Sequence, residues 1–344
     1  MPLDVERHCS RNPPQRKATR RDAGNSLIIG LVNNMPDTAL QATEAQFAGL
    51  LSNAADSLRV RVRLSFLPEV PRGEEGRAHL DSGTYWPIEA LLQEPLDALI
   101  VTGMEPVAPL LSDEPYWQRM GQLLNWADTN TTSSIWSCLA AHAAVELLDG
   151  IRRRRLDSKR CGVFAHTVLP DQPLLNGLSA PVYNPHSRWN ELPVEQLRAA
   201  GYSVATLSPE TGADMFTKQS RSLFVFFQGH PEYEATTLLR EYRRDIGRFL
   251  RGQQSHYPTL PHQYFSPAAL DLLSAFEKRV AAEPAAELLA QFPTAAIADT
   301  LRNTWGAGAS RIYRNWLTRL AGERFQARKT TKNRSTAKVS SSRL

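Results

Sequence analysis

A cysteine stands between an apolar strand and a helix of small residues. Residues 132–137 predict a short buried strand, Cys138 follows it directly, and residues 139–148 predict a helix rich in alanine and leucine. A thiol at such a turn stands clear of the sheet and faces the helix N-terminus, whose N–H groups lower a thiol pKa and can bind an oxyanion. The small residues let helix and strand approach closely, as in the nucleophile elbow of hydrolases. Cys138 is therefore a candidate nucleophile.

A histidine and an acid follow another apolar strand far downstream. Residues 224–227 predict a buried strand that leads into Gly229-His230-Pro231-Glu232-Tyr233. An activated cysteine needs a base and a group that orients the base, and His230 and Glu232 supply these types. A lone cysteine in an apolar stretch is usually a packed core residue. Two such signals at the C-terminal ends of apolar strands, where open α/β sheets place their sites, favour catalysis.

These residues need a sheet to position them, and the hydrophobic pattern predicts one. Strands alternate with helices, which indicates a mostly parallel, doubly wound α/β sheet. Residues 59–64 alternate strictly and so predict a half-exposed strand. Beyond residue 252 the pattern becomes helical, and we expect these helices to pack on the same sheet. The other predicted strands cover 26–32, 97–101, 162–168 and 202–207, and the other predicted helices cover about 40–51, 115–127, 267–282, 285–291 and 310–320.

The chain of 344 residues carries its positive charge at its two ends. Residues 323–344 hold seven basic residues and one acidic residue, and residues 1–22 hold six and three. Such polar segments cannot bury a core. We therefore expect basic disordered tails over 1–25 and 323–344, dispensable for folding, around one domain over 26–322 whose helical extension starts near residue 253. Nucleic-acid binding by the tails is a minor alternative.

Composition excludes several classes of protein. No apolar run reaches the length of a membrane helix, and the basic N-terminus lacks the apolar core of a secretory signal. The three cysteines, Cys9, Cys138 and Cys161, suggest neither a disulfide framework nor a zinc site. We expect a reducing cytoplasm, no membrane and no metal.

Further motifs extend the pattern along the chain. They are Asn34-Met35-Pro36, Thr102-Gly103, Tyr116-Trp117, Gly162-Val163-Phe164-x-His166, Pro185-His186-Ser187-Arg188 and Glu241-Tyr242-x-Arg244-Asp245. Together with the Cys138 and His230 motifs, from about residue 27 to 320, they resemble homoserine O-acyltransferases of the homoserine O-succinyltransferase type, in the class I glutamine amidotransferase-like superfamily. Glutamine amidotransferases share the sheet and the Cys/His/Glu arrangement, but not the motif at 185–188.

The resemblance implies a flavodoxin-like fold and the transfer of an acyl group from acyl-CoA to the hydroxyl of L-homoserine, which opens methionine biosynthesis. It makes Cys138 the acyl-thioester nucleophile, His230 the proton acceptor and Glu232 the residue that orients His230. Acyl-CoA is then a co-substrate, and no bound cofactor is expected. A homodimer is a further expectation.

The resemblance also implies substrate contacts. Lys159, Ser187 and Arg244 match the positions that bind the amino-acid substrate, and Val107 falls where the family tunes its acyl-CoA preference. A guanidinium such as Arg244 suits the homoserine carboxylate. For the oxyanion we expect two backbone N–H donors, those of Leu139 and Met104.

Four residues have plainer interpretations. His142 lies one turn beyond Cys138, so its side chain points along the helix, and we interpret it as a packed histidine. Cys161 is interpreted as structural. His166 and His186 are candidates only for a supporting role behind the reacting groups.

The chain also departs from the family pattern in two places. Asp37 and Thr38 stand where the family commonly has lysines, and Met104-Glu105-Pro106 stands where it usually has Ala-Pro. Val107 is neutral and so tolerates a succinyl carboxylate, although Glu105 lies near. We therefore expect O-succinyl transfer. The alternatives are O-acetyl transfer, a serine acceptor, a glutaminase-type amidohydrolase, and a non-catalytic binding protein that uses its basic tails.

Overall fold

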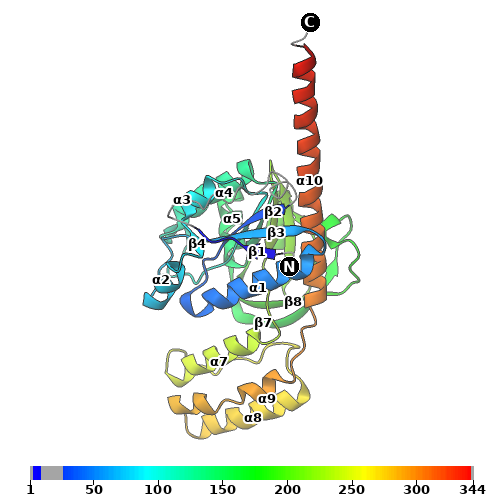
Figure 1. Cartoon of the computed structure of the whole chain (residues 1–344). Coiled ribbons are helices and arrows are strands. Elements are labelled where there is room, and N and C mark those ends of the chain that lie inside the picture. Colours follow the sequence, from blue (N-terminus) through cyan, green and yellow to red (C-terminus); the bar gives the residue numbers. More distant parts are fainter. Residues whose placement is uncertain (1–2, 9–25, 342–344) are drawn as a thin grey trace.

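A mostly parallel sheet of nine strands forms the centre of the protein (Figure 1). The computed structural model describes residues 3–8 and 26–341, with side chains up to residue 326. Seven of the nine strands run parallel to their neighbours, and β12 and β9 complete one edge in antiparallel fashion. The strands are, from edge to edge, β1 (Leu3–Val5), β3 (Arg59–Ser65), β2 (Ser26–Val32), β5 (Ala98–Val101), β6 (Ser133–Ser137), β13 (Leu223–Phe227), β12 (Met215–Gln219) and β9 (Ser203–Val204), with β4 (Tyr85–Trp86) beside β3.

The order of the five central strands, β3-β2-β5-β6-β13, is the flavodoxin-like 2-1-3-4-5 order. This confirms the predicted α/β class. In such a sheet the carboxyl ends of neighbouring strands meet at one edge, which is where ligands bind. Cys138 follows β6 and His230 follows β13, so both lie at that edge.

Helices cover both faces of the sheet because successive strand residues point to opposite sides. In β2, Ile28 and Val32 pack with α3, α4 and α5, whereas Leu27, Ile29 and Leu31 pack with α1 and α10. The helices of the first face are α3 (Ile88–Leu92), α4 (Trp117–Asn130) and α5 (Leu139–Asp149), and those of the second are α1 (Asp37–Ala55) and α10 (Gly306–Ser341).

A four-stranded antiparallel sheet stands beside the central one. Its order is β11-β10-β7-β8, and the long pair β7–β8 shifts register between Arg155 and Arg160. Most of the basic run from 152 to 160, for which no strand was predicted, thus forms the first half of β7, which begins at Arg154. The strands are β7 (Arg154–Val168), β8 (Val182–Glu191), β10 (Thr206–Ser208) and β11 (Gly212–Ala213).

The C-terminal helices divide between two locations. The apolar face of α10 packs on the central sheet through residues such as Tyr313 and Trp316, as predicted. By contrast, α8 and α9 form a separate apolar cluster with α7, set apart from the sheet in Figure 1. The remaining helices are α2 (Glu74–Leu80), α6 (Val194–Ala199), α7 (Thr237–Leu250), α8 (Pro267–Ala282) and α9 (Thr294–Ala298), with single 3-10 turns at Leu111–Asp113, Pro173–Leu175 and Ala286–Gln291.

Two segments that were predicted to be disordered contain secondary structure. Residues 3–5 form β1, which pairs with β3, and residues 323–341 continue α10. Arg324 donates to the backbone oxygen of Ser26. Residues 9–25, including Cys9, and 342–344 lie outside the described residues.

The strand at residues 59–64 is also more buried than its alternation predicted. Arg63 is only 6% exposed. The reason is the N-terminal segment, because Glu6 pairs with both Arg61 and Arg63 at 3.0 and 2.7 Å. The charge of Arg63, which would otherwise face water, is thus covered by an N-terminal segment for which the sequence analysis predicted no structure.

Candidate active site

The turn between β6 and α5 holds Cys138 in a strained backbone conformation. Its φ is 53° and its ψ is −116°, which a residue with a side chain rarely adopts. The Cys138 N–H donates to Phe227 O at 2.7 Å, and this bond fixes the turn to the end of β13. Fully buried Ala140 and Ala141 let α5 start close to the sheet. The predicted elbow is therefore present, with the thiol partly exposed at its tip.

His230 and Glu232 form a buried pair beside this thiol. His230 Nδ1 lies 2.8 Å from Glu232 Oε1, and both side chains are less than a tenth exposed. Burial lowers the pKa of His230, but the Cys138 thiolate and the Glu232 carboxylate outweigh it and hold that pKa well above its ordinary value. The His230 ring stacks on Tyr233 at 4.2 Å between centroids, and it is close enough to Cys138 for the thiolate to raise its pKa. The three side chains thus lie in the order that the predicted nucleophile, base and orienting acid require.

The Thr102-Gly103 turn after β5 borders the other side of the thiol. A Cβ atom placed on Gly103 would lie 3.1 Å from Leu139 N and 3.5 Å from Cys138 Cβ. Glycine therefore leaves open the space in front of the Leu139 N–H, one of the two predicted oxyanion donors. Met104, which carries the other predicted donor, follows directly in the chain and is buried.

Three elements bring Lys159, Ser187 and Arg244 to one polar cluster. Lys159 Nζ on β7 lies 2.7 Å from Asp245 Oδ2, and Arg244 Nη2 lies 3.1 Å from Asp245 Oδ1. Ser187 on β8 donates to Glu241 Oε2. Burial raises the pKa of Asp245, but Lys159 and Arg244 outweigh it and hold that pKa below its ordinary value. The three predicted substrate residues are therefore neighbours, although the sequence separates them by up to 85 positions.

The cluster contains partners that the sequence analysis named only as members of motifs, without a role. Glu241 and Asp245 are one turn apart on α7, and Tyr233 donates to Glu241 Oε1 at 2.6 Å. Because the Tyr233 ring also stacks on His230, it joins the polar cluster to the base. Glu241 and Asp245 are spaced i and i+4 on one predicted helix, and this spacing was the signal that could have assigned them to the same cluster as Arg244.

The loop that contains Val107 is exposed and charged. Val107 is 67% exposed, and its N–H and that of Ala108 both donate to buried Glu114 at 2.8 Å. Glu105 on the same loop pairs with Arg248 on α7 at 3.0 Å. The carboxylate that complicated the sequence interpretation therefore has a cationic partner.

Two other candidates are structural, as predicted. His142 Nε2 lies 3.0 Å from Gln228 Oε1, and burial, followed by Arg188, lowers the pKa of His142 to about 3. Burial raises the pKa of Cys161 to about 12, so that thiol stays protonated. A neutral packed histidine and an inert thiol cannot replace the pair at Cys138 and His230.

Among the described residues, one group has the donor types of a metal site: His166, His186 and Asp214, with ligand atoms within 4.8 Å of one another. The group borders the backbone of Gly229, and its hydrogen bonds are analysed below. None of the described helices is both long enough and apolar enough to cross a membrane.

Comparison with known proteins shows which family the chain resembles. A family profile described as "Homoserine O-succinyltransferase" matches residues 12–324. A homoserine O-succinyltransferase of Rhodopseudomonas palustris is 48% identical over 94% of this chain and 95% of that protein. One of Bradyrhizobium japonicum is 47% identical over 86% of this chain and 90% of that protein. A solved glutamine amidotransferase of Methylobacillus flagellatus is 15% identical, with a TM-score of 0.48, over 86% of this chain and 94% of that one. The chain belongs to the homoserine O-succinyltransferase family.

Proposed function

We propose that the protein transfers the succinyl group of succinyl-CoA to the hydroxyl of L-homoserine through an acyl-thioester on Cys138. One observation carries this proposal: the thiol, its base His230 and its orienting acid Glu232 lie beside a polar cluster suited to an amino acid. Glutamine carries the same carboxylate and ammonium groups, so the choice of L-homoserine as acceptor rests on the family to which the chain belongs. The names of the relatives favour succinyl transfer over acetyl transfer.

The first half-reaction forms the thioester. The Cys138 thiolate attacks the carbonyl carbon of the acyl-CoA, and the oxyanion accepts hydrogen bonds from Leu139 N–H and Met104 N–H. When the intermediate collapses, the bond to CoA sulfur breaks, and the departing thiolate takes a proton from the His230 imidazolium. The products are free CoA, acylated Cys138 and neutral His230.

The second half-reaction uses His230 as a base. The neutral imidazole takes the hydroxyl proton of L-homoserine while that oxygen attacks the thioester carbonyl. Collapse of the second oxyanion releases the Cys138 thiolate and the O-acyl amino acid. The imidazolium and the thiolate are then present again, which the raised pKa of His230 favours.

The polar cluster offers a partner for each charge of an amino acid. The Arg244 guanidinium, about 44% exposed, suits the carboxylate, and Glu241 suits the ammonium group. Lys159 is already paired with Asp245, so we assign it to holding that carboxylate and Arg244 in place. Tyr233 would set the position of the ammonium group relative to His230.

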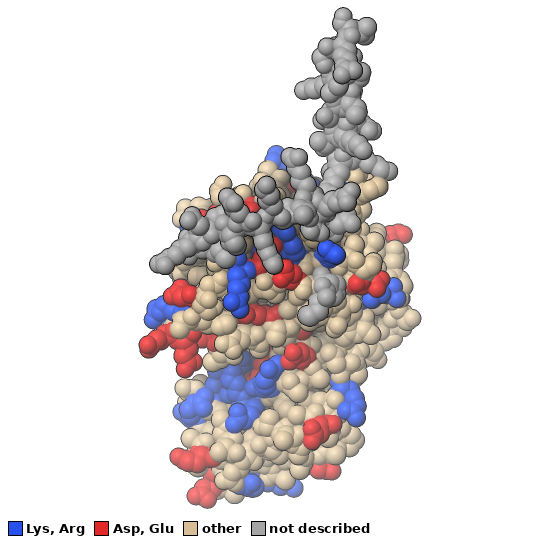
Figure 2. All heavy atoms as spheres, in the orientation of Figure 1, with Lys and Arg blue, Asp and Glu red and all other residues tan. Residues whose placement is uncertain are grey.

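The basic face of α7 suits the anionic donor. This helix contains Arg240, Arg243, Arg244 and Arg248, and Figure 2 shows lysine and arginine side chains gathered over this part of the molecule. CoA phosphates bind best to such a surface. Val107 has no charge and Glu105 is paired with Arg248, so neither repels a succinyl carboxylate strongly.

The test is to incubate the protein with succinyl-CoA or acetyl-CoA alone and measure the intact mass, then add L-homoserine, L-serine or L-glutamine. We expect one succinyl group on Cys138, its removal by L-homoserine, and no ammonia from glutamine. Cys138→Ala should gain no mass, while Cys161→Ala, which loses the inert thiol, should behave like the wild type. Absence of a Cys138 adduct would overturn the proposed chemistry.

Two further expectations remain proposals. A cytoplasmic location is supported by the need for a reduced Cys138 thiol. A homodimer is testable by analytical ultracentrifugation of the whole chain.

A further inference from the structure

The peptide that carries His230 is attached to two buried residues outside the triad. Gly229 N–H donates to Asp214 Oδ1 at 2.7 Å, and His230 N–H donates to Pro185 O at 2.8 Å. Gln228 N–H donates to the backbone oxygen of Asp214 at 3.0 Å. Three consecutive N–H groups therefore have fixed acceptors, and two of these belong to Asp214.

Gly229 packs closely against Asn184, Pro185 and Asp214. A Cβ atom on Gly229 would lie 2.5 Å from Asn184 Nδ2, 2.8 Å from Pro185 O and 2.9 Å from Asp214 Oδ1. No side chain fits in that space. The position of the His230 backbone is thus set by contact with Asp214 and Asn184, and the side chain of His230 extends from there to Cys138.

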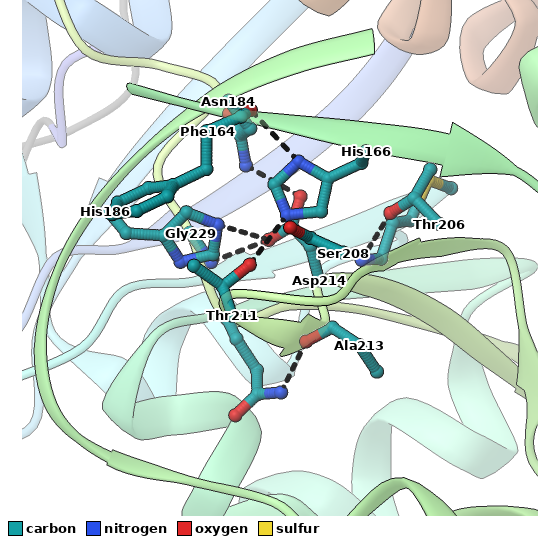
Figure 3. A network of polar contacts seen from close by, with 12 residues as sticks. Phe164, His166, Asn184, His186, Thr206, Ser208, Thr211, Ala213, Asp214 and Gly229 are labelled. Atoms are coloured by element: carbon teal, nitrogen blue, oxygen red, sulfur yellow. Dashed lines mark hydrogen bonds and ion pairs between the residues drawn. The ribbon is translucent and has the colours of Figure 1, made fainter. Parts of the chain in front are cut away.

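The Asp214 carboxylate is 4% exposed and needs donors to remain buried (Figure 3). Asn184 Nδ2 donates to Oδ2 at 2.8 Å, and Gly229 N–H donates to Oδ1. His186 Nε2 lies 3.6 Å from Oδ1. Two N–H groups therefore donate to the carboxylate, and the His186 ring lies beside it.

The hydrogen bond at Nδ1 of His186 determines which ring nitrogen carries the proton. Arg188 Nε lies 3.2 Å from His186 Nδ1, and a guanidinium can only donate, so Nδ1 accepts. Burial, followed by the charge of Arg188, lowers the pKa of His186 well below its ordinary value, so the ring is neutral. Its single proton is on Nε2, which faces Asp214.

This arrangement disfavours a metal ion at His166, His186 and Asp214. A metal ligand must offer a lone pair, and His186 Nε2 bears the proton. His166 Nε2 contacts the Thr211 hydroxyl at 3.0 Å, and its Nδ1 lies 3.1 Å from Phe164 O. Arg188 would also place a permanent positive charge beside the ion. The group has the features of a hydrogen-bond network.

We propose that Asp214 is a positioning residue whose carboxylate holds the Gly229 N–H and thereby keeps His230 in contact with Cys138. The inference rests on the proposed Cys138 and His230 pair. When the acceptor is removed, the Gly229 peptide has a buried N–H without a partner and moves to find one. His230 then moves with it and loses the contact that stabilises its charged form.

The experiment compares Asp214→Ala with Asp214→Asn and with Phe216→Leu. The amide oxygen of Asn can still accept the Gly229 N–H, and a rotated Asn184 amide can accept from the new NH2 group. Phe216 is a buried residue of β12, two positions after Asp214. Phe216→Leu therefore removes core packing but leaves the contact between Asp214 and Gly229 in place. For each variant we measure kcat and KM, the melting temperature, and the ¹⁵N NMR pH titration of His230, whose signal is identified by its loss in His230→Ala.

We expect Asp214→Ala to lower kcat about 100-fold, to change KM for L-homoserine little, and to move the His230 titration down toward its ordinary value. The charged and titratable groups that face His230, namely Cys138, Glu232, Tyr233 and His186, are unchanged in this variant. Asp214→Asn should titrate and turn over nearly like the wild type. Phe216→Leu should lower the melting temperature without shifting the titration.

The result that overturns the inference is an unchanged His230 titration in Asp214→Ala, or the same shift in Phe216→Leu at an equal loss of melting temperature. If Asp214→Ala does not fold, Asn184→Ala takes its place and should shift the titration less but in the same direction; no shift overturns the inference. One equivalent of zinc in the wild-type protein, lost in both Asp214→Ala and His186→Ala, also overturns it in favour of a metal site. A wild-type His230 with an ordinary titration contradicts the proposed pair itself, which is a separate failure.

Discussion

At the scale of single residues, the contact of His230 with Glu232 is the one whose loss is most informative. Among the described residues, none forms a hydrogen bond with the second oxygen of Glu232, Oε2, and Glu232 borders a cavity of about 440 Å³ between α1 and the start of α10. A neutral amide fits there and keeps the oxygen that accepts from His230. Charge and geometry at this position can therefore be separated by substitution.

His230→Ala should lower kcat/KM by about 10²–10⁴-fold, because the proton acceptor is lost. Glu232→Gln should lose less, because the imidazole remains oriented and only the charge is removed. The measurement is CoA release with succinyl-CoA and L-homoserine. If Glu232→Gln matches the wild type, the carboxylate charge plays no part in the mechanism.

At the scale of elements, the turn after β5 controls the space in front of the oxyanion donor. Gly103→Ala would bring a methyl group to 3.1 Å from Leu139 N. We expect kcat to fall about 10²–10³-fold, the loss typical of one oxyanion donor, with little change in melting temperature. Gly49→Ala on α1 is the control, because a Cβ there meets nothing within 4 Å. An active Gly103→Ala enzyme would place the oxyanion elsewhere.

The following loop should determine the acyl donor. Val107→Glu should move the preference from succinyl-CoA toward acetyl-CoA, because the new carboxylate repels the succinyl end. Val107→Gln adds nearly the same volume without charge and separates the two effects. The quantity to compare is the ratio of kcat/KM for the two donors. An unchanged ratio in Val107→Glu would mean that the Glu105 and Arg248 pair has moved the specificity determinant.

The sequence predicted the elements around Cys138 and His230 because their signals are local. An apolar strand that runs straight into a cysteine and a helix of small residues can be recognised without knowledge of any distant contact. The resemblance supplied Lys159, Ser187 and Arg244. Asp214 gave no such signal, because a single aspartate between two short strands has meaning only when β12 pairs with β13 and brings it to Gly229.

At the scale of the whole molecule, the N-terminal strand illustrates a different limit of prediction. The segment around Glu6 is polar and basic by composition, so it was predicted to be disordered. Its stability comes from partners far along the chain: Arg63, Arg61 and Trp86, whose Nε1 donates to Glu6 O at 2.9 Å. Composition carries no information about an ion pair between residues 57 positions apart, such as Glu6 and Arg63.

A chain without residues 1–25 should therefore be less stable, by on the order of 2 kcal/mol, because buried Arg63 loses Glu6, the nearer of its two carboxylate partners, and keeps only Glu94 at 3.4 Å. Activity per folded molecule should be unchanged, since β1 is at the edge of the sheet and the thiol follows a central strand. Urea unfolding and CoA release measure the two effects. Glu6→Gln in the whole chain is the control that isolates the charge. Equal stability of the shortened and whole chains would show that β1 contributes nothing.

Acid should destabilise the protein through its buried neutral histidines. His142 titrates at about pH 3 in the folded protein and near 6.5 when unfolded, so between these values only the unfolded chain binds the proton. The free energy of unfolding should thus fall as the pH drops from about 6.5 toward 3, by up to about 2 kcal/mol between pH 6.5 and pH 5. His142→Gln should reduce this dependence in urea titrations at pH 5 and 7, and His186 should account for part of the remainder. An identical pH dependence in the variant would contradict the assignment.

The register of β6 and β13 has a consequence for how this catalyst can diversify. Ser137 lies opposite Phe227 in the parallel pairing of these strands, and the proposed nucleophile Cys138 and base His230 follow shortly after the two strand ends. The distance between Cys138 and His230 is therefore set by the spacing between two neighbouring strands. The groups that would recognise the acceptor come from β7, β8 and α7, which lie outside that pair of strands. Evolutionary changes in β7, β8 and α7 can therefore alter which acceptor or donor is bound, while the reaction at the ends of β6 and β13 stays the same.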